Sequence, residues 1–322
     1  MNHKIIARLS HVSPSTVSKA LSGSSEVSPE TAEKIRQIAI DVGYFKEKNK
    51  RKRNYSHNRQ LLIALIVPEV MGFHYSSIIT YIKNEVEAKG GNIAIYVSDF
   101  SNEKANNLLK SVIMHSGADG VIMFALPSHE INPNIPIITI GSSCKEYDSI
   151  KCDMNRIIND SVEYLYGLGH KKIGFVGEYN TISATESFKH ITNCPDDFVY
   201  IVNGRFETIG IQAAERIILQ KNRPTALICA YDEIAISLIH QLNKNSVRVP
   251  DDISVMGINN ISSSAYAQIP LTTVDTFSSE QYKIAIDILF DKIINETQIV
   301  KHMTIEHKLI ERETTKKQET NK

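Results

Sequence analysis

The sequence predicts an all-α helix-turn-helix headpiece at residues 1–45, a basic linker at residues 46–60 and an α/β core at residues 61–322. Near the start, apolar residues recur at the spacing of two short helices separated by a polar turn. Beyond residue 60, nearly continuous apolar segments alternate with amphipathic ones, which is typical of parallel strands covered by helices on both faces. Residues 1–60 hold 12 Lys and Arg against 5 Asp and Glu, whereas the whole chain holds 36 of each. A neutral total therefore conceals a basic head and an acidic body.

The first two helices of the headpiece meet at a turn before Pro14. Ser13 stands where an N-cap belongs, and Pro14 suits the first helical position. We expect Val12 and Val17, which flank the turn, to pack inward and to set the helices at a wide angle. Gly23 ends the second helix, and Ser28-Pro29 opens a third. The apolar residues that define the first two helices are Ile6, Leu9, Val12, Val17, Ala20 and Leu21.

The second helix offers a small, polar and basic outer face, which suits the major groove of DNA. We expect Pro14 and Ser15, at its start, to approach base edges. The residues expected to contact phosphates or nearby bases are Ser13, Thr16, Ser18 and Lys19. Ser15 has only one hydroxyl, so DNA shape is expected to supply much of the specificity.

The linker is the most basic part of the chain. Residues 46–53 hold six basic groups and one acid. Such a run is solvated in the free protein, and we expect it to become ordered on DNA, where Lys and Arg release counterions from phosphates. The DNA-binding candidates in this region are Lys50, Arg51, Arg53 and Tyr55.

The core is long enough for two sheets of about five or six strands each. We expect the first lobe at residues 61–158 and 277–300, and the second at residues 159–274 and 303–315. The predicted strands are 61–67, 93–97, 120–124, 137–140, 172–176, 198–202, 225–229 and 253–258, and the predicted helices are 75–89, 102–116, 156–168, 208–219 and 233–243. Because doubly wound sheets bind ligands at the carboxyl ends of their strands, a cleft between the lobes is the expected sensor site.

Several motifs recur in a fixed order along the whole chain. The headpiece motifs are residues 7–13 and 16–22, and the core motifs include Pro68-Glu69 and residues 117–122, 168–177 and 223–226. The most specific motif is Val249-Pro250-Asp251-Asp252-Ile253-Ser254-Val255-Met256-Gly257, followed by residues 270–274 and 309–315. Together these motifs resemble the lactose-repressor and galactose-repressor (LacI/GalR) family of bacterial transcription regulators.

This resemblance implies a periplasmic-binding-protein-like core and a mechanism. A homodimer places two headpieces on a pseudo-palindromic operator, and a small effector in the cleft changes how they are presented. We therefore expect a repressor of carbohydrate-utilisation genes that responds to a sugar or sugar phosphate. Because the sequence shows no targeting or membrane segment and no metal-ligand spacing of its cysteines, we expect it to work in the cytoplasm without a cofactor or metal.

The chain departs from the family in the turn and in the linker. His11 replaces a glycine in the turn, and histidine tolerates a left-handed backbone less well. In the linker, the leucine that wedges into the minor groove in relatives is replaced by Arg53, which cannot unstack a base step as an apolar side chain does. Tyr55 is an alternative wedge.

The expected effector pocket departs from the family as well. The family's sugar-binding Arg, Asn and Asp correspond here to Ala184, Tyr231 and Asn259. Asp232 and Asn259 retain hydrogen-bonding capacity, and Tyr231 can either stack on a sugar or fill the cleft. A filled cleft would make the regulator ligand-independent or subject to a protein partner. The effector-site candidates are Phe73, His74, Tyr75, Asp153, Ala184, Tyr231, Asp232 and Asn259.

Other classes of protein receive little support. Residues 167–169 lack the third glycine of a dinucleotide fingerprint, and neither a Gly-x-Ser-x-Gly elbow nor a His-Glu-x-x-His motif is present, so we expect no enzyme. The four cysteines lack metal-ligand spacing. A periplasmic sugar-binding protein would share the core, but it would begin with an apolar leader and not with a DNA-binding pattern.

Overall fold

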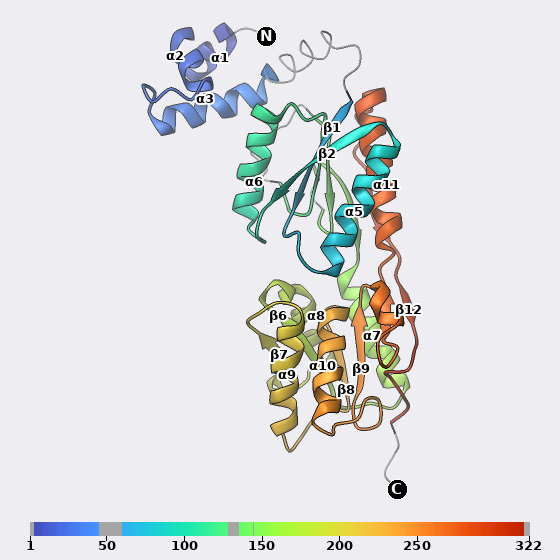
Figure 1. Ribbon diagram of the computed structural model, residues 1–322. Coiled ribbons are helices and arrows are strands. Elements are labelled where there is room, and N and C mark those ends of the chain that lie inside the picture. Colours follow the sequence, from blue (N-terminus) through green and yellow to red (C-terminus); the bar gives the residue numbers. More distant parts are fainter. Residues whose placement is uncertain (1–2, 45–59, 128–134, 144, 319–322) are drawn as a thin grey trace. The chain divides into compact units, whose positions relative to one another are not determined.

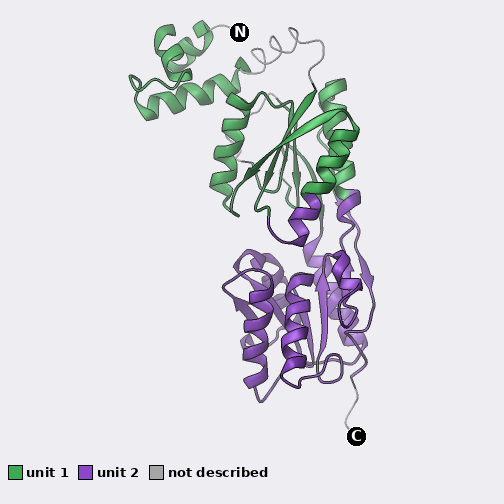
Figure 2. Cartoon of the chain, viewed as in Figure 1, with its two compact units in different colours: residues 1–70, 79–151, 281–303 green, residues 71–78, 152–280, 304–322 purple. Residues whose placement is uncertain are grey.

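The computed structural model describes residues 3–44, 60–127, 135–143 and 145–318. The chain forms two compact units, each assembled from three segments (Figure 2). Unit 1 contains residues 1–70, 79–151 and 281–303, and unit 2 contains residues 71–78, 152–280 and 304–322. The long middle segment of unit 2 begins at residue 152, ahead of helix α7 (Met154–Gly167), whereas a boundary at residue 158 would cut this helix.

The headpiece has the three helices that the sequence predicts: α1 (His3–Ser10), α2 (Pro14–Leu21) and α3 (Pro29–Asp41). Ser13 caps α2 by accepting a hydrogen bond from the Thr16 amide at 3.1 Å, which confirms the predicted cap. Val17 is fully buried. Leu9 differs from the expected apolar pattern, since its side chain is 46% exposed. Ser10 is buried in its place and donates a hydrogen bond to the Ile6 carbonyl at 2.7 Å.

Unit 1 contains a six-stranded sheet in the order β11-β5-β4-β3-β1-β2. Helix α6 (Asn102–Ser111) covers one face, and α5 (Phe73–Ala88) and α11 (Ser278–Asn295) cover the other (Figure 1). Strands β1 to β5 are parallel where they pair, and β3 and β4 are buried along their whole length. The strands are β1 (Leu61–Val67), β2 (Gly91–Val97), β3 (Gly120–Met123), β4 (Ile137–Ile140), β5 (Asp148–Cys152) and β11 (His302–Ile305).

Unit 2 repeats this architecture with the sheet order β12-β10-β9-β8-β6-β7. Only β12 runs antiparallel to its neighbour among the described pairs of this sheet. Helix α9 (Glu207–Leu219) packs closely on α10 (Asp232–Lys244) at Gly210, where a Cβ atom would lie 2.4 Å from the Ile234 carbonyl oxygen. Helix α8 (Ile182–Thr192) packs on α7. The strands are β6 (Ile173–Glu178), β7 (Val199–Val202), β8 (Ala226–Cys229), β9 (Ser254–Ile258), β10 (Thr272–Asp275) and β12 (Lys308–Ile310).

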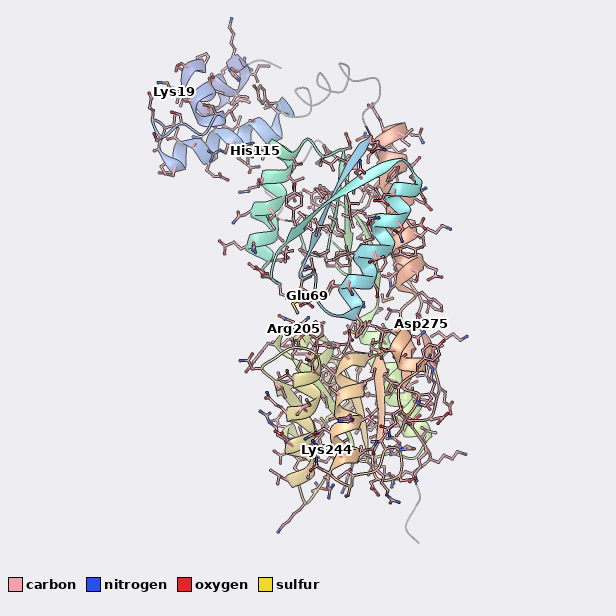
Figure 3. All side chains as sticks on the ribbon, in the orientation of Figure 1. Lys19, Glu69, His115, Arg205, Lys244 and Asp275 are labelled. Carbon is pink, nitrogen blue, oxygen red and sulfur yellow. The ribbon has the colours of Figure 1, made fainter. Side chains whose placement is uncertain are left out.

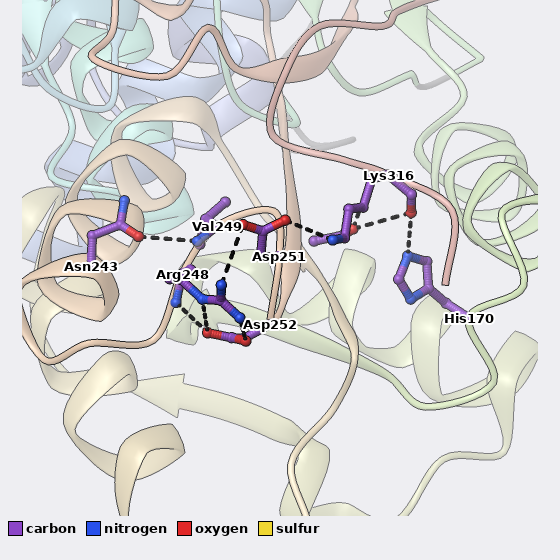
Figure 4. A network of polar contacts seen from close by, with 8 residues as sticks. His170, Asn243, Arg248, Val249, Asp251, Asp252 and Lys316 are labelled. Atoms are coloured by element: carbon purple, nitrogen blue, oxygen red, sulfur yellow. Dashed lines mark hydrogen bonds and ion pairs between the residues drawn. The ribbon is translucent and has the colours of Figure 1, made fainter. Parts of the chain in front are cut away.

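The segment after β12 is fixed on unit 2 by polar contacts at the amino end of the sheet (Figure 4). His170 contacts the Lys316 carbonyl oxygen through Nε2 at 3.0 Å, and the Lys316 ammonium contacts Asp251 at 2.6 Å. Nearby, Arg248 forms an ion pair with Asp252 at 2.7 Å. The Pro250–Asp252 turn, which is part of the most specific motif of the sequence, thus helps to hold this segment in place.

Candidate nucleic-acid interface and effector site

The outer face of α2 is exposed and polar. Ser15 and Ser18 are exposed, Thr16 and Lys19 are half-buried, and Val17 points into the headpiece core between them. Ser13 also contacts the Thr16 hydroxyl at 2.9 Å, so the first turn of α2 is fixed by its own side chains. The N-cap and the first six residues of α2 bring together all six DNA-binding residues that we predicted in the headpiece.

Lys19 has an intramolecular partner. Its ammonium donates to Glu26 at 2.5 Å, and the side chains of Lys19 and Glu26 are 45% and 65% exposed. The sequence analysis missed Glu26, although it lies in the loop that follows Gly23. Any phosphate that binds Lys19 must compete with this carboxylate.

The turn before α2 has the strained backbone expected from its histidine. His11 has φ 57°, in the left-handed region that favours glycine. Gly23, after α2, has φ 78°, as befits a residue that ends a helix. The linker candidates Lys50, Arg51, Arg53 and Tyr55 lie outside the described residues.

A second set of polar residues lies at the carboxyl edge of the unit 2 sheet. Arg205 and Asp275 are at this end of the unit, opposite Lys244 at the end of α10 (Figure 3). Glu178 ends β6, Tyr231 follows β8, and Asn259 follows β9. In open α/β sheets this edge is where ligands bind.

Four side chains at this edge, which we call the edge cluster, contact one another: Glu178, Arg205, Phe206 and Tyr231. The Arg205 guanidinium forms an ion pair with Glu178 and donates to the Tyr231 hydroxyl at 3.5 Å. Its Cζ atom lies 4.6 Å from the centre of the Phe206 ring and 6.0 Å from that of Tyr231, within range of cation–π attraction. Of these four, only Tyr231 was predicted from the sequence.

Glu178 is held firmly. Its side chain is 4% exposed, and its backbone exchanges two hydrogen bonds with the Thr181 hydroxyl, at 3.0 Å and 2.7 Å. Gly177 makes this possible, because a Cβ atom there would lie 2.4 Å from the Thr181 oxygen. In the β6–β7 register Glu178 is opposite Val202, which brings Arg205, three residues beyond, within reach.

Phe206 has a strained backbone, with φ 53° and ψ −124°. Its ring packs against Gly72, where a Cβ atom would lie 2.4 Å from two ring carbons. Two residues after Gly72, the His74 backbone amide donates a hydrogen bond to the Glu233 carboxylate at 3.3 Å. Burial lowers the pKa of the His74 imidazole to about 4. Residues 71–78, which belong to unit 2, are thus attached to its sheet edge at two points.

Asp232 is fully buried and stabilises the fold of this edge. Its carboxyl accepts hydrogen bonds from the Thr273 hydroxyl at 2.5 Å and the Ile261 amide at 2.8 Å. Burial raises the pKa of Asp232 to about 7, although these hydrogen bonds act to lower it. Asp232 therefore joins α10 to β10 and to the segment that follows β9.

The other predicted effector residues differ in their surroundings. Asp153 caps α7 by accepting from the Arg156 amide at 3.3 Å, and Ala184 is buried in the core of unit 2. Asn259, at φ 101°, is half-buried at the sheet edge. Phe73 is 62% exposed, and Tyr75 lies edge-on to His74 with ring centres 5.2 Å apart. Their roles in effector binding stay predictions.

Two features are absent from the residues that the structure describes. No helix there combines the length and the apolar content needed to span a membrane. Nor do those residues bring together three His, Cys, Asp or Glu side chains in a group suited to a metal ion.

Comparison with known proteins finds two matching families. Residues 4–47 match the bacterial regulatory proteins of the lacI family, and residues 162–315 match the periplasmic binding protein-like domain. The ribose operon repressor of Haemophilus influenzae is 24% identical over 97% of this chain and 97% of its own length.

Two solved structures share the fold. The lac repressor dimer bound to operator and the anti-inducer ONPF is 20% identical, with a TM-score of 0.71 over 97% of this chain and 98% of its own. The complex of the transcriptional regulator CelR with cellobiose is 19% identical, with a TM-score of 0.65 over 98% of this chain and 99% of its own. With its helix-turn-helix headpiece and its two parallel-sheet units, the chain is a DNA-binding transcription regulator of the LacI family.

Proposed function

We propose that this regulator is a repressor that binds a pseudo-palindromic operator as a homodimer and reads bases with the start of α2. The exposed first turn of α2 carries this proposal. In helix-turn-helix proteins the amino end of the second helix meets base edges in the major groove. The basic headpiece and linker add the phosphate attraction that this docking requires.

Within α2 we assign different tasks to Ser15 and Lys19. Ser15, exposed at the second position of the helix, donates to or accepts from a base edge. Lys19 leaves Glu26 and binds a phosphate, which adds affinity without sequence information. Pro14 approaches the bases, and Ser13, Thr16 and Ser18 contact phosphates or nearby bases.

Selection of operators from random DNA by the full chain, followed by titration at several salt concentrations, tests these assignments. We expect two half-sites related by a dyad. Ser15→Ala should relax the preference at one base pair of each half-site. Lys19→Ala should weaken binding to all sequences alike and reduce the slope of log affinity against log salt by about 1. Single, unpaired half-sites would contradict the dimer.

Glu26 provides a sharper test of the Lys19 assignment. Glu26→Gln releases the Lys19 ammonium from its ion pair, so operator affinity should rise. Glu30→Gln is the matched control, because it removes the same charge from the headpiece without touching Lys19. Equal effects of the two variants would show that only net charge matters and would refute the Lys19 assignment.

We further propose that the effector is a sugar or sugar phosphate that binds at the carboxyl edge of unit 2. Phe206 and Tyr231 offer ring faces there, and Arg205, Glu178 and Asn259 offer hydrogen-bonding groups. The names of the ribose operon repressor and of the CelR–cellobiose complex support a carbohydrate. Genes of carbohydrate utilisation are then the proposed targets, and the cytoplasm is the proposed location.

A second candidate is a regulator that needs no small ligand. The observation that favours it is the edge cluster itself, whose side chains already bond to one another and so satisfy the groups a ligand would use. Thermal unfolding of the full chain with a panel of free and phosphorylated sugars separates the two candidates, since a ligand of the folded state raises the melting temperature. A panel without any shift would favour control by a protein partner.

A further inference from the structure

We infer that the Glu178–Arg205 pair makes the effector site select neutral ligands over their phosphate esters, with Glu178 as the specificity-determining residue. The ligand class is a small ring compound that bears hydroxyl groups and no charge. This inference rests on the proposal that the edge cluster contacts the effector.

The argument begins with the burial of the two charges. Glu178 is 4% exposed, whereas the Arg205 side chain is 29% exposed and lies nearer the solvent. The buried carboxylate cancels the charge of the guanidinium from behind. A ligand that approaches Arg205 from the solvent side therefore meets hydrogen-bond donors but no net positive charge.

A phosphate group would have to share Arg205 with Glu178. Two anions on one guanidinium lie a few ångströms apart, and their repulsion is strong where water is excluded. Displacing Glu178 from Arg205 would also be unfavourable, because it would leave a buried carboxylate without its partner. Hydroxyl groups of a neutral ligand avoid both costs.

Two other carboxylates lie at this edge: Glu233 in the first turn of α10, and Asp275 at the end of β10, three strands from β6 in the sheet order. Asp275 accepts hydrogen bonds from the Asn260 amide group at 2.9 Å and the Phe277 backbone at 2.8 Å, and Glu233 accepts from His74. The second cation nearby, Arg312, bonds to Asn260, Ser264 and the Leu271 carbonyl. Acidic groups thus outnumber the two arginines among the described residues of this edge.

The aromatic residues determine the shape of the ligand. The rings of Phe206 and Tyr231 lie 6.4 Å apart at an interplanar angle of 68°, so they form two walls next to the guanidinium. Such walls suit the apolar face of a sugar ring or a nucleoside. The strained backbone of Phe206 is independent support, because strain of this kind gathers where a ligand needs a side chain held in one place.

Calorimetry on the full chain tests the inference with matched probes: ribose and ribose 5-phosphate, glucose and glucose 6-phosphate, cytidine and cytidine 5′-phosphate. We expect at least one neutral probe to bind, and its phosphate ester to bind at least about tenfold more weakly. Glu178→Gln keeps the shape and the hydrogen bond to Arg205 but removes the charge. This variant should reduce the ratio of the affinities for the neutral probe and its phosphate ester about tenfold or more, mainly by strengthening the binding of the phosphate ester.

Two controls accompany this variant. Asp196→Asn removes the acid of an exposed ion pair with Lys189 in the same unit and should leave both affinities unchanged. Arg205→Lys keeps the charge pair and should keep the neutral preference, whereas Arg205→Gln should weaken the neutral probe. If Glu178→Gln does not fold, the two Arg205 variants still test whether the charge pair sets the preference for the neutral probe.

Three outcomes would overturn the inference: a phosphate ester that binds the wild type more tightly than its neutral partner, a selectivity that Glu178→Gln does not change, or no binding by any probe. Operator binding, measured in parallel by fluorescence anisotropy, separates this failure from failure of the proposed function. A chain that binds its operator but fails the probe test remains a repressor with a different control.

Discussion

At the scale of single residues, His11 shows that the turn of the headpiece tolerates strain. Its left-handed φ of 57° costs an L-residue about 1–2 kcal/mol, whereas glycine adopts it freely but loses about 0.5–1 kcal/mol more backbone entropy on folding. His11→Gly should therefore stabilise the headpiece by roughly 0.5–1 kcal/mol. Hydrogen exchange of headpiece amides in the full chain measures this change. Ser25→Gly, in a neighbouring turn without positive φ, should have the opposite sign, and a stabilising effect there would argue against strain as the cause.

Asp232 should give unit 2 a stability that depends on pH. Its pKa of about 7 in the folded chain exceeds the 3.8 of an ordinary aspartate. Between these values the unfolded chain has released the proton while the folded chain retains it, so the free energy of unfolding falls as pH rises from 4 to 7. The contribution of Asp232 is fully present below pH 4.

Urea unfolding at pH 5, 6 and 7 tests this dependence. In the Asp232→Asn variant the side chain is neutral at every pH, so the free energy of unfolding should fall less between pH 5 and pH 7. Asp252→Asn is the opposite case, because the hydrogen bond from Arg248 lowers the pKa of Asp252 to about 2 and its contribution is lost only at acidic pH. A wild-type chain whose stability does not fall from pH 5 to pH 7 relative to Asp232→Asn would contradict the shift.

At the scale of elements, a buried ion pair ties α11 to β5. The Lys292 ammonium lies 2.5 Å from Asp148, the two side chains are 10% and 3% exposed, and Asp148 also accepts from the Lys301 amide at 2.7 Å. Asp148→Ala would leave a buried ammonium unpaired and should destabilise unit 1 by roughly 3–5 kcal/mol.

Chemical unfolding monitored in unit 1 checks this prediction. The control is Glu87→Ala, which breaks the exposed pair with Lys83 on α5 and should change stability by less than about 0.5 kcal/mol. Similar losses of unfolding free energy in the two variants would mean that the buried Lys292–Asp148 pair stabilises the fold no more than an exposed pair does.

Most of the long apolar strands and amphipathic helices could be predicted from sequence, although α11 was not among them, whereas short or polar elements could not. Strands β5, β10 and β12 have three to five residues with polar members, such as Asp148 and Thr272, and they are strands because neighbours pair with them. Helix α8 carries a weak apolar pattern around Phe188 and was missed for the same reason. The residues around such an element in the sequence do not show which distant segments will pair with it in the folded chain.

The candidate sites show the same limit. The α2 face and its cap follow from adjacent residues, so Ser13 and Pro14 suffice to predict them. The edge cluster depends on pairing between β6 and β7, which brings Glu178 to Arg205 across 27 positions of sequence. The sequence feature that could have indicated this site is a charged residue at the end of an apolar strand, as Glu178 is at the end of β6.

At the scale of the whole molecule, the uneven charge distribution predicts that operator binding weakens steeply with salt. Each phosphate contact contributes about 0.9 to the slope of log affinity against log salt, so removing four linker charges should lower the slope by up to about 3–4. The variant changes Lys50, Arg51, Lys52 and Arg53 to alanine. The matched control removes four exposed lysines of the acidic body: Lys171, Lys221, Lys283 and Lys308. If the two variants lower the slope equally, the linker has no specific part in binding.

The placement of β11 and β12 has a consequence for biosynthesis. Only Glu306 and His307 separate these strands, yet β11 forms the last strand of one sheet and β12 that of the other. Neither sheet can be complete on the ribosome until residues 302–310 have been translated and have left the exit tunnel. A premature stop after residue 301 would remove an edge strand from both units at once and deprive β5 and β10 of a partner. Such fragments should be degraded and not accumulate as free DNA-binding heads attached to one finished unit.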